Sequence, residues 1–155
     1  MIQLGSTLVE DYPWVYKLDP ALSQEGLDDA YERFMDQGLI DLLPTQPGQR
    51  PTVFMLRHLR GKAKRRVVGL LLSAGADIAQ TPEALFEAAA YGLVAVKDLQ
   101  TDSGKLVEFE SETDSYGCKR IKASILEQLE QVNDGDLIGQ IGRQVIEALT
   151  PRKKS

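Results

Sequence analysis

The sequence contains a single histidine, His58, and a single cysteine, Cys118, among its 155 residues. Most transition-metal sites need several His or Cys ligands, and most nucleophile–base pairs need a histidine beside the nucleophile. Because Cys118 has no second cysteine to pair with, a disulfide framework is excluded. We therefore expect a protein that is not an enzyme, with no catalytic residue, no metal and no cofactor, in which both side chains serve in packing.

Long apolar runs and a basic, apolar beginning are also missing. The first 20 residues contain Glu10, Asp11 and Asp19 and lack the pattern of a signal peptide. No stretch approaches the roughly 20 consecutive apolar residues of a transmembrane helix. These absences predict synthesis in a reducing cytoplasm and no membrane partner.

The composition is otherwise that of a folded protein. Hydrophobic residues make up 43% of the chain and the net charge is −5. Such values are ordinary for a globular domain and argue against disorder. The length allows one domain with a substantial core and one extension.

Charge is distributed in blocks along the chain. Residues 1–49 carry nine acids against two bases, and residues 73–117 carry nine acids against two bases. Residues 118–155 carry seven bases against five acids. Residues 50–72 carry no acid, and their seven bases are Arg50, Arg57, Arg60, Lys62, Lys64, Arg65 and Arg66.

The basic block has two interpretations. It can pack beside the acidic blocks and be neutralised by them, which is the usual fate of a charge run. It can instead form an electrostatic surface that docks another subunit. Nucleic acid is an unfavourable partner for a chain this acidic. The residues that we expect to bind a partner here are Arg57, Arg60, Lys62, Lys64, Arg65 and Arg66.

The pattern of the chain predicts an α+β fold, with a small mixed or antiparallel sheet, a hairpin and several covering helices. Residues 14–18 are expected to form a short strand or an extended anchor. Further strands are expected at residues 52–59, 93–99 and 106–109, the last two flanking a turn at Thr101–Gly104. Helices are expected from Leu27 to a stop at Gly38, over 60–72, from a Thr81 cap to Gly92, over 121–132 and over 137–149. Gly139 and Gly142 of the last helix are expected to allow close helix packing.

A proline-rich stretch at residues 44–51 marks the best internal boundary, as a linker or an ordered loop. It divides an acidic arm or helical extension, residues 1–49, from an α+β core domain, residues 50–155. The arm holds five of the ten aromatic residues. Trp14 and Tyr16 are predicted as anchors that dock on a neighbour. The alternative is that Trp14 and Phe34 join the main core.

Residues 52–155 resemble small morphogenesis and virion proteins of tailed bacteriophages, including tail assembly chaperones. The resemblance lies in a strand at residues 54–61 that leads into a helix, the Gly92-Leu93 pair, and the Lys97-Asp98-Leu99 segment. It continues in the strand at 104–109, the helix with Ile125 and Leu129, the helix from Asp136 to Leu149, and the tail at 150–155.

This resemblance implies a non-enzymatic virion protein of the tail, neck or baseplate that binds other phage structural subunits. Its partners would be copies of itself or a tail or neck protein, in the host cytoplasm during assembly and then in the virion. One alternative is a transient chaperone that leaves the finished particle. Another is a small nucleic-acid-binding regulator with residues 61–73 as its recognition helix.

Overall fold

The structure, a computed structural model, describes residues 11–74 and 82–149. Within these ranges it contains five α-helices and two antiparallel sheets, which confirms the predicted α+β class. The elements in chain order are β1 (Tyr12–Val15), α1 (Leu27–Gln37), the 3₁₀ turn η1 (Ile40–Leu42), β2 (Val53–Leu56), α2 (Gly61–Ala74), α3 (Pro82–Gly92), β3 (Leu93–Lys97), β4 (Ser111–Thr113), β5 (Lys119–Ile121), α4 (Ala123–Glu130), the 3₁₀ turn η3 (Val132–Gly135) and α5 (Asp136–Glu147).

The larger sheet has the strand order β1-β2-β3 and separates two hydrophobic clusters. Trp14 lies opposite Phe54 in the register, and Val15 lies opposite Val53. Because side chains alternate between faces along a strand, the first pair contributes to the main core and the second pair to a smaller cluster beneath α1. Phe34 belongs to that smaller cluster.

The expected boundary between residues 49 and 50 falls inside this sheet. β1 precedes the boundary, β2 follows it, and the two strands pair over four residues each. The proline-rich stretch between them is an ordered loop, since Ser23 N donates to Pro44 O at 2.9 Å and Gln46 N donates to Ala21 O at 2.8 Å. Residues 12–43 therefore share a sheet and a core with the rest of the described chain.

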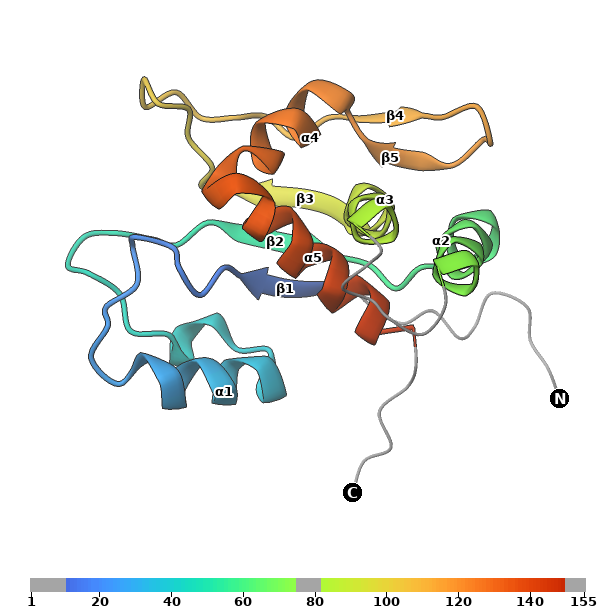
Figure 1. Cartoon of the computed structure of the whole chain (residues 1–155). Helices are drawn as coiled ribbons and strands as arrows, with labels where there is room; N and C mark the ends of the chain where they lie inside the picture. The colour runs from blue at the N-terminus through green and yellow to red at the C-terminus, as the bar shows by residue number, and fades with distance from the viewer. Residues whose placement is uncertain (1–10, 75–81, 150–155) are drawn as a thin grey trace, which may run out of the picture.

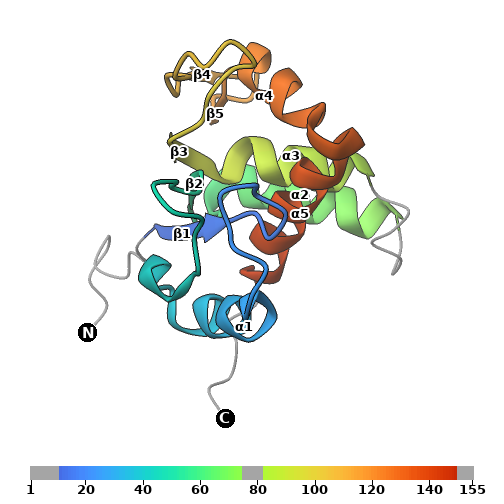
Figure 2. The same cartoon turned by 90° about the vertical axis from the view of Figure 1, so that its left-hand side faces the viewer.

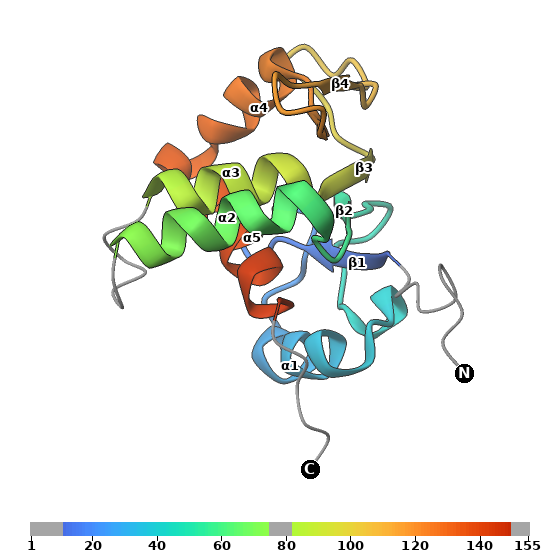
Figure 3. The same ribbon diagram turned by 90° about the vertical axis from the view of Figure 1, so that its right-hand side faces the viewer.

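Helix α5 crosses one face of the sheet, whereas α1 lies on the β1 side and α4 lies with the β4–β5 hairpin on the β3 side (Figure 1). Helices α2 and α3 run side by side next to the sheet (Figure 3). Seen along the sheet, α3 and α5 pack together in the middle of the molecule (Figure 2). The main core lies between these helices and the sheet.

Glycine allows the close approach of α3 and α5. A Cβ on Gly142 would lie 2.8 Å from the Cα of Leu85 and overlap its carbonyl group, and a Cβ on Gly92 would lie 2.9 Å from Val145 Cγ1. The predicted packing role is thus confirmed for Gly142. Gly139 has nothing within 4 Å of such a Cβ, so its predicted role is wrong within this chain.

The predicted hairpin turn at Thr101–Gly104 forms, with Thr101 N donating to Lys105 O at 2.8 Å and Gly104 at a φ of 82°. The predicted strand at residues 106–109 does not form, and a single bridge joins Gln100 to Leu106. Asp98, at a φ of 60°, turns the chain at the end of β3. The regular hairpin follows instead, as β4 and β5 around Gly117.

The helix predictions are confirmed to within a few residues for α1, α2, α3, α4 and α5. Gly38 ends α1 in the left-handed conformation, with its N–H donating to Phe34 O at 2.7 Å. The N-cap of α1 is Gly26, in the left-handed conformation. The Thr81 cap of α3 and the tail at residues 150–155 lie outside the described residues.

Candidate docking site

Trp14 and Tyr16, the two predicted anchors, are packed inside the fold. Trp14 is 4% exposed and Tyr16 is 6% exposed. The indole centroid lies 6.1 Å from the Tyr16 ring and 5.9 Å from the Phe54 ring. The structure therefore places both rings in the core, because β1 turns one of its faces toward α5. Neither ring projects toward solvent as a docking anchor would.

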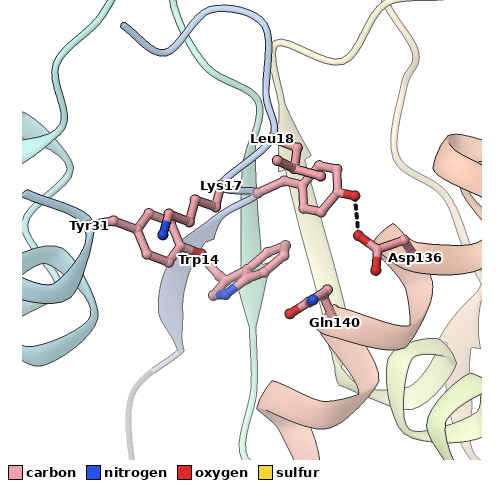
Figure 4. A pocket seen from close by; sticks show the side chains of 7 residues that line it. Trp14, Lys17, Leu18, Tyr31, Asp136 and Gln140 are labelled. Carbon is pink, nitrogen blue, oxygen red and sulfur yellow. Dashed lines mark hydrogen bonds between the residues drawn. The ribbon is translucent and has the colours of Figure 1, made fainter. Parts of the chain in front are cut away.

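A hollow of about 330 Å³ opens beside these two rings, between β1, α1 and the beginning of α5 (Figure 4). Its lining residues are Trp14, Tyr16, Lys17, Leu18, Tyr31, Asp136 and Gln140. The Tyr16 hydroxyl donates to the Asp136 carboxylate and accepts a hydrogen bond from Asn133 Nδ2 at 3.0 Å. Burial raises the pKa of Tyr16 above its ordinary value, and the Asp136 carboxylate adds to the rise.

Two other polar side chains of the hollow bind groups outside its lining. Lys17 Nζ lies 2.7 Å from the Asp28 carboxylate, and this hydrogen bond and charge lower the pKa of Asp28. The Tyr31 hydroxyl donates to Val15 O at 2.7 Å on the free edge of β1. Pro13 lacks a backbone N–H, so the edge offers a poor template for a further strand. The contacts of Lys17 and Tyr31 join α1 to β1 and to the residues that follow β1.

Two of the predicted basic residues are built into the fold. Arg57 Nε donates to Tyr91 O at 2.6 Å, and Arg57 Nη2 donates to Lys119 O at 3.0 Å. These bonds attach the end of β2 to α3 and to β5. Burial lowers the pKa of Arg57, and the charge of Arg60 lowers it further. The role of this side chain is to join three elements.

Arg66 belongs to a cluster of charged and aromatic side chains between α2, α3 and the β4–β5 hairpin. The Glu87 carboxylate accepts a hydrogen bond from Arg120 Nη1 at 3.0 Å, and Arg66 Nε lies 3.7 Å from the same oxygen. The Arg66 guanidinium also lies 4.4 Å from the centroid of the Tyr116 ring. Arg66 thus faces the hairpin and stabilises it.

Tyr91 extends this cluster to the base of the hairpin. Its hydroxyl donates to the Asp114 carboxylate, and Asp114 Oδ1 accepts hydrogen bonds from the backbone of Tyr116 and Cys118 at 2.9 Å each. Burial is the main reason that the pKa of Tyr91 is raised to about 12. This cluster was not predicted from the sequence. The available signal was Glu87, a single acid within the apolar run 84–91.

The remaining predicted basic residues form an exposed surface, here called the basic face, which consists of Arg60, Lys62, Lys64 and Arg65. α2 packs its buried stripe, with Ala63 and Val67, on the core and leaves its three lysine and arginine residues of this group exposed, while Arg60 directly precedes the helix. None of the four makes an ion pair with a residue in ranges 11–74 and 82–149. Leu72, which lies about two turns after Arg65 on α2, is 77% exposed.

The two interpretations of the basic block therefore apply to different residues. Arg50, which lies 4.0 Å from Asp98, and Arg66 face acids, and Arg57 binds carbonyl groups. The basic face is unpaired within the described part of the chain and is available to a partner. It is the candidate docking site.

His58 and Cys118 lie in packing positions. The His58 ring centroid is 5.1 Å from that of Tyr12, and Cys118 is buried in the main core. Among the described residues, no group of three or more His, Cys, Asp and Glu side chains is placed to hold a metal ion. No described helix has the length and apolar character needed to span a membrane.

Comparison of the chain with protein-family models, with curated proteins and with solved structures finds no match.

Proposed function

We propose that this chain is a non-enzymatic structural or assembly protein of a tailed bacteriophage, and that it binds other structural subunits through the basic face. The resemblance over residues 52–155 supports the phage setting. The setting would be the host cytoplasm during assembly and the virion afterwards. The exposed charges on α2 support the mode of action.

The single observation that carries the proposal is the unpaired state of the basic face within the described residues. Like charges three or four positions apart on a helix cost about 0.2–0.5 kcal/mol per pair. Lys62 and Arg65 stand in this relationship, and so do Lys62 and Arg66. The isolated fold gains nothing from this repulsion, whereas an acidic partner surface removes it.

The chemistry of the face favours a protein partner. Leu72 continues the exposed side of α2 beyond the charges, with 77% of its surface open to solvent. A protein surface that combines acids with an apolar patch matches both parts. A nucleic acid matches only the charges, and a net charge of −5 opposes its approach.

The test is quantitative mass spectrometry of purified particles of a phage that encodes this chain. We expect the chain at a defined ratio to the major structural proteins, and loss of the Lys62→Glu/Arg65→Glu variant from the particles. Lys105→Glu is the matched control, because Lys105 is also exposed but lies in the turn after β3. This variant should be retained.

Complete absence of the wild-type chain from particles would contradict the structural role and favour the transient chaperone. Binding to DNA that weakens steeply with added salt, together with absence from particles, would favour the regulator. Equal retention of the double variant and the wild-type chain would show that the basic face is not the docking surface.

A further inference from the structure

Helix α1 carries an exposed acidic surface, here called the acidic stripe, formed by Asp29, Glu32 and Asp36. The spacing of three and four residues places these side chains on one side of the helix. The opposite side, with Leu27 and Phe34, is buried against the sheet. The three acids make no ion pair with any residue that the structure describes. Arg33 is the cation beside them.

Helix α2 carries the complementary surface at the same spacing. Lys62, Arg65, Gly69 and Leu72 follow each other at intervals of three or four residues, and all four are exposed. Gly69 is the second observation that points to a partner. A Cβ at this position would meet nothing within 4 Å, so the fold does not require glycine there. Glycine inside a helix costs about 0.5–1 kcal/mol relative to alanine, and it permits close approach of another backbone.

The two surfaces lie on different sides of the molecule. Helix α1 lies on the β1 side of the sheet, and α2 lies next to α3 at the end of the sheet (Figures 1 and 3). The ion pairs of the described chain include none between α1 and α2. The surfaces therefore cannot neutralise each other within one chain, although their charges match.

We propose that a second copy of this chain places its acidic stripe on the basic face, so that copies associate head to tail. This proposal rests on the proposed function, because it names the structural subunit that the basic face binds. An exposed leucine follows each surface along the chain. Leu72 follows the basic face, and Leu39, which is 55% exposed, follows α1. A contact between two different surfaces leaves one of each free, so association continues into a ring or a filament.

Sedimentation velocity of the full chain at low salt tests the proposal. We expect concentration-dependent association that added salt weakens, because salt screens exposed charges. Lys62→Glu/Arg65→Glu and Asp29→Lys/Glu32→Lys should each weaken association about a hundredfold or more, because each variant brings like charges together. An equimolar mixture of the two variants should associate again, since each then meets an opposite charge.

Restored association in the mixture also shows that both variants are folded. A wild-type chain that stays monomeric throughout the concentration range would overturn the proposal, as would a mixture that stays monomeric while the single variants remain folded by circular dichroism.

If the wild-type chain is monomeric yet the Lys62→Glu/Arg65→Glu variant is lost from particles, self-association fails and the proposed function stands. If the wild-type chain associates in solution yet is absent from particles, the structural role fails and self-association stands.

Discussion

Gly142 of α5 lies directly against the backbone of Leu85 in α3, so that a Cβ at position 142 would come within 2.8 Å of the Leu85 Cα. Gly142→Ala must therefore push the two helices apart. We expect the free energy of unfolding to fall by about 1–3 kcal/mol, as for other overpacked cores. Urea unfolding measures the change.

The matched control is Gly139→Ala in the same helix, where a Cβ has open space. This variant should be as stable as the wild-type chain or gain about 0.5–1 kcal/mol, because alanine is favoured over glycine in a helix. If Gly142→Ala loses no more stability than Gly139→Ala, the result would show that α3 and α5 do not pack closely at position 142.

Gly69→Ala tests the proposed self-association, and Gly139→Ala is its matched control. Gly69→Ala should raise the free energy of unfolding by about 0.5–1 kcal/mol. It should also weaken self-association about tenfold, because the added methyl group separates the two backbones. Gly139→Ala should leave association unchanged. Sedimentation at matched concentrations gives the comparison, and unchanged association of Gly69→Ala would show that no close approach occurs there.

The cluster around Glu87 predicts a strong effect of Arg120→Ala. The Glu87 side chain is 11% exposed and the Arg120 side chain is 18% exposed, so truncation leaves a nearly buried carboxylate with Arg66 at 3.7 Å. We expect a loss of about 2–4 kcal/mol in the free energy of unfolding.

Lys122→Ala is the control for this variant. Lys122 Nζ lies 2.8 Å from Glu110 Oε2, but both side chains are about half exposed, at 48% and 56%. Exposed pairs contribute little to stability, because solvent screens them. Similar losses for Arg120→Ala and Lys122→Ala would mean that the buried cluster does not stabilise the hairpin.

Alkaline pH should destabilise the fold through three buried or partly buried tyrosines. Burial raises the pKa of Tyr12, Tyr31 and Tyr91 from 10.0 to about 12, and burial is the largest cause for each. Between these values the folded state holds more protons than the unfolded state, so the free energy of unfolding falls as pH rises. Their contribution is fully present below pH 10 and is lost as pH rises through about 12.

Urea unfolding at about pH 9 and about pH 11, with the phenolate absorbance of the folded chain, measures this dependence. Tyr31→Phe should remove one tyrosine that ionises above pH 10 in the folded chain. It should therefore reduce the loss of stability at alkaline pH. An unchanged absorbance titration in Tyr31→Phe would contradict the assignment of Tyr31.

Much of the fold could be predicted because its signals are local. Gly38 ends α1, Gly104 forms a turn, and Asp136 begins α5, each within a few residues of the pattern that indicates it. The pairing of β1 with β2 was not predicted, because it joins Trp14 to Phe54 across 40 positions and a proline-rich loop. A loop of this composition suggests a linker, but backbone hydrogen bonds order it here.

The candidate site was predictable in composition but not in detail. The charge pattern identified residues 50–72 as a basic segment that could bind a partner. It did not separate Arg57 and Arg66 from the four bases of the basic face, because their partners Tyr91 and Glu87 come from α3. Trp14 illustrates the same limit, since an aromatic residue suits a core as well as an interface.

The most direct test of the account is site-specific photo-crosslinking in purified phage particles. A photo-reactive phenylalanine derivative would replace Arg65 in one variant and Lys105 in another, both exposed but only the first in the basic face. We predict that position 65 crosslinks to a structural subunit or to a second copy of this chain, whereas position 105 does not. Crosslinks from position 65 to nucleic acid alone, or equal protein crosslinks from both positions, would contradict the account.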